Sequence, residues 1–262
     1  MTPDQRAFLD RLGPWRILRD LGWGISDQEV LLVEAGGPKT VKCGGEANRH
    51  LHREIDAHTG PLRHFSATPA LVAADRGAKI LVLEHVPGTL ADHAEPCPGH
   101  AEEAGALLAE LHDLVPPDTD TTLDEKLTAS ALRWLSKPTG FDDGLIRRAR
   151  AVLEHHEAIP LEVTFCHGDY SPRNWLIGER LIVLDFGRSG MRPPSYDFLQ
   201  LLTHPWWPTI ATDFLRGYGA SLDLDSLRIQ RIREAVTIGA WAHRAGQVDF
   251  HRRAQSELSA LL

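Results

Sequence analysis

The sequence predicts an α+β fold with two lobes, a small N-terminal lobe built on an antiparallel sheet and a larger, mainly helical C-terminal lobe. Short strand-like runs, separated by glycine and proline turns and interrupted by one helix, occupy most of the first 86 residues. From residue 102 onward, apolar residues recur every three or four positions, as they do along one face of a helix. We therefore place the boundary between a lobe of residues 1–86 and a lobe of residues 87–262.

Length and composition are those of an ordinary folded protein. A chain of 262 residues with 42% hydrophobic and 24% charged residues can bury a sizeable core, which excludes general disorder and a fibrous protein. The formal net charge of -8 argues against wholesale nucleic-acid binding. No apolar run is long enough for a signal peptide or a bilayer span. We therefore expect a cytoplasmic protein that binds neither nucleic acid nor membrane, as a monomer or homodimer.

The cysteines and histidines do not follow a metal-binding pattern. Cys43, Cys97 and Cys166 have neither metal-ligand spacing nor an even pairing, which indicates a reducing compartment and free thiols. None of the fourteen histidines falls in a His-Glu-x-x-His arrangement. We interpret them as solvated or packed side chains rather than ligands.

The first lobe is predicted to be a meander of strands with one helix between them. The strand-like runs are ILRDLGWGISDQEVLLVEA, KTVKC, ALVAAD and AKILVLEHV. Between the second and the third, helical spacing over residues 46–58 predicts a helix that the Gly60-Pro61 pair ends. The Pro87-Gly88 pair breaks the last strand, which is why the lobe boundary is placed there.

The second lobe is predicted to contain a series of helices and one hairpin. An apolar stripe begins at Glu102 and stops at Pro116-Pro117, as expected of a helix. The runs NWLI and LIVLD flank Gly178 as the two strands of a hairpin do. Further helices are expected at residues 123–136, 142–158, 196–203, 208–220, 225–245 and 249–262.

Polar residues at the ends of this hairpin carry the candidate chemistry. Asp169 lies in Cys-His-Gly-Asp, five residues before Asn174, and Asp185 follows at the end of the apolar run IVLD. The oxygens of Asn174 and Asp185 suit magnesium, and Asp169 is a candidate acceptor for the proton of a substrate hydroxyl. Each of these residues alone also fits a turn or a helix cap. The order Asp-x4-Asn, then Asp-Phe-Gly beyond a hairpin, favours a phosphoryl-transfer site.

These motifs resemble those of the aminoglycoside phosphotransferase family, the small-molecule branch of the protein-kinase-like fold. CHGDYSPRN and LDFGRSG resemble its catalytic and metal-binding loops, and LGWGISDQEV resembles its nucleotide-covering loop. TVKC resembles its lysine strand, LVLEHVPG its hinge, and LLAELHDL the helix before its catalytic loop. The resemblance extends over nearly the whole chain. It implies a bilobal protein-kinase-like fold with a nucleotide-binding N-terminal lobe, and transfer of the γ-phosphoryl group of ATP, or of GTP, with Mg²⁺.

The resemblance also implies roles for residues of the first lobe. Lys42 resembles the lysine that contacts the nucleotide phosphates, and a lysine in an apolar strand needs anionic partners. Glu54 resembles the helix glutamate that pairs with this lysine, and Glu46 is the alternative. The remaining nucleotide-binding candidates are Gly22, Gly24 and Ser26 in the covering loop, and Glu84 and Val86, whose backbone groups would bind adenine.

The second lobe departs from the family pattern at one position of the catalytic loop. The residue two after Asp169, often histidine in this branch, is Ser171 here. Neutralisation of the charge on the transferring phosphate is therefore assigned to Arg173 or Arg188, with the choice left open. Asp197 resembles an aspartate that braces the catalytic loop, and it also fits a plain helix cap. His112 and His167 are expected to be scaffold residues.

The substrate is predicted to be a small hydroxylated molecule. Only nine residues separate Gly187 from Asp197, and no Ala-Pro-Glu anchor follows, so a peptide platform is excluded. Residues 225–262 contain six arginines against four carboxylates, which does not favour a polycation. An aminoglycoside, another antibiotic, a sugar, a choline-like molecule or an amino-acid hydroxyl therefore all remain open. A catalytically silent nucleotide-binding module is the third possibility.

Overall fold

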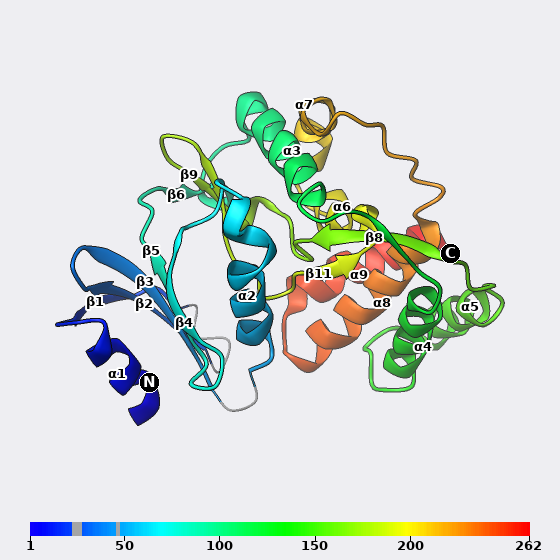
Figure 1. The fold of residues 1–262 in the computed structure, drawn as a ribbon. Coiled ribbons are helices and arrows are strands. Elements are labelled where there is room, and N and C mark those ends of the chain that lie inside the picture. The colour runs from blue at the N-terminus through cyan, green and yellow to red at the C-terminus, as the bar shows by residue number, and fades with distance from the viewer. Residues whose placement is uncertain (23–27, 46–47) are drawn as a thin grey trace. The chain divides into compact units, whose positions relative to one another are not determined.

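The computed structural model of the chain describes residues 1–22, 28–45 and 48–262, so the candidates Gly24, Ser26 and Glu46 lie outside it. The chain, drawn in Figure 1, divides into two compact units. The predicted α+β class is confirmed by the sheets and helices of these units, whereas the lobe boundary after residue 86 stays a prediction. The first unit comprises Met1–Pro116, Phe165–Met191 and Thr209–Gly219, and the second comprises Pro117–Thr164, Arg192–Pro208 and Ala220–Leu262.

A five-stranded antiparallel sheet forms the centre of the first unit, as the strand-like runs predict. Its strands lie in the order β1-β2-β3-β5-β4, so β1 and β4 form the edges. β3 and β5 lie inside the sheet, and their side chains are mostly buried because both faces are covered. The bounds are β1 (Arg16–Asp20), β2 (Gln28–Glu34), β3 (Pro38–Gly44), β4 (Leu71–Asp75) and β5 (Ile80–Glu84).

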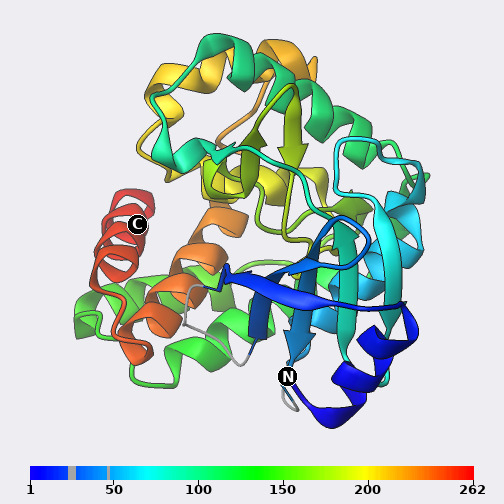
Figure 2. The ribbon, with the colours of Figure 1, turned by 90° about the vertical axis from the view of Figure 1, so that its left-hand side faces the viewer.

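Two helices cover opposite faces of this sheet, α1 (Pro3–Arg11) and α2 (His50–Thr59), as Figures 1 and 2 show. The alternation of side chains along β5 accounts for this arrangement. Ile80 and Val82 pack in one apolar cluster with residues of α1, and Leu81 packs on the other face with residues of α2. Burial of both faces stabilises the sheet by removing apolar surface from water.

The buried side chain of Gln5 fixes α1 to the sheet. Its Nε2 donates to the backbone oxygens of Gly44 and Ala78, each at 3.0 Å, and reaches that of Lys79 at 3.3 Å. These carbonyls lie at the end of β3 and in the turn before β5. The Lys79 carbonyl also accepts the Gly44 N–H at 3.0 Å, so the amide joins a hydrogen-bonded contact between the ends of the two strands and ties α1 to it.

α2 begins later than the sequence pattern predicts. The pattern runs from residue 46, but Asn48 Oδ1 accepts a hydrogen bond from the Leu51 N–H at 3.0 Å, which marks the start of the helix near residue 49. At the other end, the predicted stop is confirmed. Gly60 follows the helix, and Pro61 opens the short 3₁₀ helix η1 (Pro61–His64).

The remaining strands of the first unit include the predicted hairpin of β9 (Trp175–Ile177) and β10 (Leu181–Val183). Strand β9 of this hairpin also pairs with β6 (Thr89–Leu90).

The helix α3 (Pro98–His112) starts one turn before the predicted Glu102, with Pro98 at its first position. Most of α7 (Trp207–Tyr218) also belongs to this unit. A methyl group at Gly105 of α3 would lie 2.0 Å from the Phe214 carbonyl oxygen of α7, so glycine permits this close approach. The short 3₁₀ helices are η2 (Ala91–His93) and η3 (Pro172–Asn174).

The second unit is mainly helical, as predicted. Its core packs α4 (Leu123–Leu135), α5 (Asp143–Glu154), α8 (Arg228–Arg244) and α9 (Val248–Leu261) around one apolar cluster. A buried ion pair joins α4 to α8 in this core, with Arg233 2.7 Å from Asp124. The Asp124 carboxylate also contacts His156, at 2.7 Å. Both carboxylate oxygens are thus engaged. The other elements are β7 (Asp118–Asp120), β8 (Leu161–Cys166, ending in the first unit), β11 (Gly190–Arg192, beginning there), η4 (Pro194–Asp197) and α6 (Phe198–Leu202).

Two further sequence expectations concern the whole described chain. Among the described residues, none of Cys43, Cys97 and Cys166 is joined in a disulfide bond. None of the helices in the described residues has both the length and the hydropathy required to cross a membrane.

Candidate active site

Two carboxylates hold the ammonium group of Lys42 inside the first unit. Lys42 Nζ lies 2.6 Å from Glu54 Oε1 and 3.6 Å from Asp185 Oδ1. Lys42 is on β3 and Glu54 on α2, and their exposed fractions are 9% and 1%. A lysine buried to this extent needs anionic partners, and both are present. The structure thus brings together Lys42 and Glu54, the pair that the sequence favours.

The electrostatics of this cluster keep Lys42 and Asp185 charged. Burial alone would lower the pKa of Lys42, but the charges and hydrogen bonds of Glu54 and Asp185 outweigh burial and raise that pKa above its ordinary value. The Lys42 ammonium in turn lowers the pKa of the Asp185 carboxyl, against the opposing effect of burial. At neutral pH the cluster therefore presents an ammonium beside a carboxylate.

The catalytic-loop candidate Asp169 is positioned by its neighbour His167. The Asp169 N–H donates to His167 Nδ1 at 3.2 Å, so the other ring nitrogen, Nε2, carries the hydrogen that it donates to the Leu184 carbonyl at 2.8 Å. Leu184 directly precedes Asp185. The imidazole therefore joins the loop of Asp169 to the strand end that carries Asp185, which is the scaffold role expected of it.

Asn174 joins the same two segments through its backbone and side chain. Its Nδ2 donates to the Asp169 carbonyl at 2.9 Å, and its own carbonyl accepts from the Leu184 N–H at 2.8 Å. Among the described residues, no group donates to Asn174 Oδ1. This oxygen is therefore left for a ligand such as a hard cation.

Asp185 has a backbone conformation that is rare for a residue with a side chain. Its φ is 61°, in the left-handed region, where residues other than glycine pay a conformational penalty. This turn directs the side chain outward, and 55% of it is exposed, although Lys42 lies on one side of it. An exposed carboxylate at this position is accessible to a ligand from solvent.

Gly168 allows the loop of Asp169 to approach the segment after Asp185. Its φ is 79°, and a methyl group on it would lie 2.2 Å from the Arg188 carbonyl oxygen. No side chain fits at that distance. The Gly of the His-Gly-Asp motif is therefore required by the backbone geometry itself.

The structure separates the two arginine candidates. The Arg173 guanidinium forms an ion pair with the Asp169 carboxylate, four residues earlier across η3. Burial tends to lower the pKa of Arg173, but the charges of Asp169, Asp185 and Asp92 raise it. For the Arg188 side chain, the described part of the chain offers no ion pair or hydrogen bond. Arg173 therefore lies among the carboxylates, and Arg188 contributes its backbone to the Gly168 contact.

The hinge candidates lie at the end of β5. The N–H of Glu84 donates to the Ala70 carbonyl at 2.9 Å, and the N–H of His85 donates to the Pro38 carbonyl at 3.2 Å. Val86 has no backbone partner for its N–H among the described residues, so it is the first free donor of this segment. In the covering loop, the described Gly22 is exposed, and its N–H donates to Asp20 Oδ1 at 2.7 Å.

The comparisons with known proteins decide the family. The model of the phosphotransferase enzyme family (APH) matches residues 18–229, which is most of the chain. The chain belongs to this family. The predicted family is confirmed, and with it the predicted enzyme class, a phosphotransferase of the small-molecule kinase type. A search of curated protein sequences gives no significant match.

Solved structures show that this family member has the predicted protein-kinase-like fold. One similar structure is a thermostable mutant of the aminoglycoside phosphotransferase APH(4)-Ia with ADP and hygromycin B, at 16% identity and a TM-score of 0.69, covering 99% of this chain and 98% of that one. Another is the macrolide 2'-phosphotransferase MphH from Brachybacterium faecium, at 18% identity, a TM-score of 0.66 and 98% coverage of both chains. The choline kinase LicA from Streptococcus pneumoniae matches at 13% identity, a TM-score of 0.68 and 97% coverage of both.

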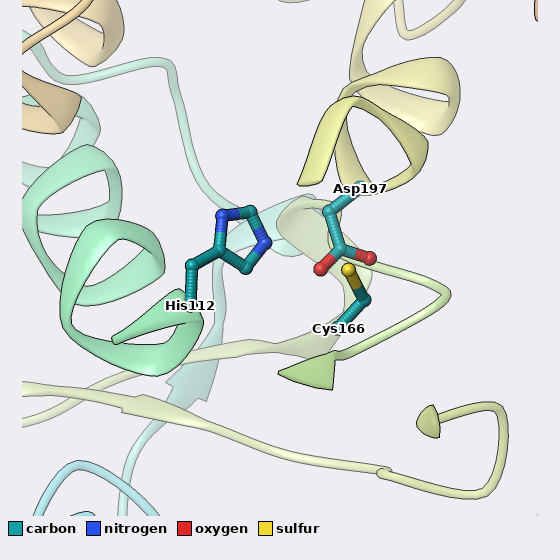
Figure 3. A group of neighbouring side chains, drawn as sticks. All are labelled: His112, Cys166 and Asp197. Carbon is teal, nitrogen blue, oxygen red and sulfur yellow. The ribbon is translucent and has the colours of Figure 1, made fainter. Parts of the chain in front are cut away.

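Figure 3 draws three buried polar side chains of this phosphotransferase, His112 at the end of α3, Cys166 at the end of β8 and Asp197 in η4. His112 and Cys166 belong to the first unit and Asp197 to the second. Within the first unit, a ring nitrogen of His112 lies 2.9 Å from the Tyr218 hydroxyl. This contact supports the expected scaffold role of His112, whereas the bracing role of Asp197 stays a prediction.

Two contacts of the site were not predicted from the sequence. The Nδ1 of His50, the first residue of α2, lies 3.0 Å from the Gly187 carbonyl oxygen, and this contact ties α2 to the Asp-Phe-Gly segment. The only available signal was its place at the start of the helix that carries Glu54. Ser171 has a buried hydroxyl without a hydrogen-bond partner in the described chain. Because a serine carries no positive charge, the positive charge beside Asp169 comes from Arg173.

Proposed function

We propose that this phosphotransferase transfers the γ-phosphoryl group of ATP to a hydroxyl group of a small molecule, with magnesium as the metal ion. The observation that carries the proposal is the convergence of Lys42, Asp169, Asn174 and Asp185 within one compact unit. Phosphoryl transfer needs little covalent help from a protein and depends on positioning and charge stabilisation. These four residues supply a cation for the phosphates, oxygen ligands for a metal ion and a carboxylate for the acceptor hydroxyl.

Lys42 holds the nucleotide phosphates in this proposal, and Glu54 fixes the direction of its ammonium group. The Val86 N–H and the Glu84 backbone take the adenine edge. Gly22 belongs to the loop that would cover the phosphates. The APH(4)-Ia structures with ADP or AMP-PNP, which share the fold, support nucleotide binding by this chain.

The donor set of Asn174 and Asp185 fits magnesium. Asn174 offers an amide oxygen that accepts no hydrogen bond from the described residues, and Asp185 offers an exposed carboxylate. Magnesium prefers such oxygen ligands. Asn174 Oδ1 and the Asp185 carboxylate would therefore hold the ion. When bound, magnesium supplies positive charge that neutralises the phosphate oxygens.

Asp169 orients the acceptor hydroxyl and takes its proton as the bond to phosphorus forms. The ion pair with Arg173 holds this carboxylate in place. Arg173, rather than Arg188, also stabilises the negative charge on the transferring group, because it lies beside Asp169 and near Asp185. We therefore propose Arg173, and not Arg188, for this role.

The acceptor is proposed to be an antibiotic, and a metabolic alcohol is the second candidate. Solved relatives of the same fold include phosphotransferases named for aminoglycosides and macrolides, and complexes with hygromycin B and gentamicin. The choline kinase has a comparable TM-score, which supports the second candidate. The arginine-rich residues 225–262 favour an acceptor other than a polycation.

The experiment that tests the proposal incubates the protein with magnesium and ATP, or GTP, against aminoglycosides, macrolides, sugars and amino alcohols. Release of ADP or GDP and a product heavier by about 80 Da, the mass of one phosphoryl group, would report the reaction. Asp169→Asn should abolish it, whereas Asp113→Asn, at an exposed position after α3, should not. Turnover that survives in Asp169→Asn would refute the role of Asp169.

A further inference from the structure

A recess in the first unit lies beside the hinge. It is lined by residues from segments 58–71, 84–87 and 179–182, and we call it the hinge cavity. These segments are the end of α2 with η1 and the loop that follows, the hinge, and the turn of the β9–β10 hairpin. Its volume of about 840 Å³ is within the range of sites that bind small molecules, roughly 300–1,000 Å³.

The hinge cavity is distinct from the candidate catalytic cluster. None of Lys42, Asp169 and Asp185 lines it. It shares only the hinge with the proposed nucleotide site, since Glu84 and Val86 form part of its wall. All of its lining residues belong to the first unit, so the recess is formed by that unit alone.

The chemistry of the wall combines buried apolar surface with exposed cations. Leu62, Phe65 and Ile182 are buried and supply apolar surface. The cations are Arg63 and Arg180, both exposed, with the exposed His64 beside Arg63 in the sequence. Such a wall suits a ligand that has an apolar body and a charged group.

The sign of the charge favours an anionic ligand. Two carboxylates also line the recess. Glu84 forms an ion pair with Lys39 Nζ at 2.8 Å that compensates its negative charge, so Glu179 is the carboxylate whose charge is uncompensated among the described residues. Arg180 keeps its charge while it donates to the Ser66 carbonyl at 2.7 Å. Arg63 has no ion pair anywhere in the described residues. The two arginines therefore outweigh the single free carboxylate.

A polar side chain without a partner also lies in the wall. Thr68 is 8% exposed, and its hydroxyl has no hydrogen-bond partner in the described chain. A buried polar group left unpaired costs free energy, and a bound ligand is one way in which such a group becomes satisfied.

We propose that the hinge cavity binds a small amphipathic anion, with an apolar body against Leu62, Phe65 and Ile182 and a carboxylate, sulfonate or phosphate group at Arg63 and Arg180. The anionic group lies at the exposed rim, where the guanidinium groups can reach it. The apolar body displaces water from the buried wall.

Anilinonaphthalene sulfonate, a fluorescent amphipathic anion, is the probe that tests the proposal. We expect it to bind the folded protein at one site per chain, with a rise in fluorescence. Arg63→Glu should weaken binding about fivefold or more, since it replaces an attractive charge by a repulsive one. Ala70→Phe, at an exposed position of the wall, should block the recess. Arg6→Glu, an exposed arginine of α1 outside the wall, is the matched control and should leave the affinity unchanged.

Circular dichroism and thermal melting establish that each variant is folded before its affinity is compared. Equal probe affinities for the wild type, Arg63→Glu and Ala70→Phe would overturn the proposal, because the probe would then bind elsewhere. So would an equal loss of affinity in Arg6→Glu and Arg63→Glu, since that result would reflect the net charge of the protein alone.

Discussion

The Lys42 ammonium and the Glu54 carboxylate lie 2.6 Å apart inside the first unit, and both side chains are almost fully buried. Removing one partner of such a pair leaves a buried charge without compensation. We expect Glu54→Gln to lower the free energy of unfolding by about 3 kcal/mol, as measured by urea denaturation. The half-exposed Glu29 pairs with the N-terminal amine, and Glu29→Gln should cost less than about 1 kcal/mol. Equal losses would show that burial of the pair is not what matters.

The stability of the protein should depend on pH through His58. Burial, together with the charge of Lys42, lowers the pKa of His58 to about 3, so the imidazole is neutral in the folded protein at pH values where the unfolded chain binds a proton. Between about pH 6.5 and pH 3 the unfolded state therefore holds more protons, and stability falls as the pH falls.

We expect His58→Gln to remove this part of the pH dependence. The wild type should lose up to about 1.4 kcal/mol more per pH unit than the variant as the pH is lowered from 6 to 4, measured by urea denaturation at each pH. His93→Gln changes an exposed histidine and is the control. If the slopes of the wild type and His58→Gln coincide, His58 is not the group responsible.

The two arginine candidates should differ in their effect on turnover. Arg173 pairs with Asp169, so Arg173→Ala should lower kcat about 100-fold, a magnitude typical of losing one group that stabilises transition-state charge. Arg188→Ala should leave kcat within about threefold, because it removes a side chain that makes no polar contact in the described residues. Steady-state kinetics with an acceptor found by the screen under Proposed function give both values. The reverse order would transfer the role to Arg188.

A single methyl group should disturb the catalytic loop. Gly168→Ala places a carbon 2.2 Å from the Arg188 carbonyl oxygen at a φ of 79°, so the loop must shift. We expect a loss of stability of more than about 1 kcal/mol together with a loss of nucleotide-dependent turnover. Gly190→Ala, where a methyl group meets nothing within 4 Å, is the matched control. A thermal melt that is equal for the two variants would contradict the close approach.

The local elements were predictable because each has a signal in the sequence. The apolar run of β5 and the hairpin around Gly178 predict strands, and the structure confirms both. Helix starts were less predictable, because they depend on single capping contacts. Asn48 starts α2 after the predicted residue 46, and Pro98 starts α3 before the predicted Glu102.

Contacts of the candidate site could be predicted from the sequence only where the chemistry of a residue demands a particular partner. Lys42 and Glu54 could be paired because a lysine in an apolar strand requires a carboxylate. The choice between Arg173 and Arg188 was not available from the sequence, because it depends on the path of the loop around η3. The contact of His50 with the Gly187 carbonyl joins residues 137 positions apart, and no local pattern encodes it.

The hydrogen bonds of Gln5 also bear on how the first unit is made during translation. α1 is synthesised before β3 and before the turn whose carbonyls its amide will meet at Gly44, Ala78 and Lys79. Until that turn and β5 have left the ribosome, the sheet that Phe8 and Leu9 pack against is incomplete, and these two apolar side chains remain exposed to solvent. The helix that emerges earliest in this unit therefore reaches its place only after β5 has emerged, and for that interval its apolar face is accessible to a chaperone.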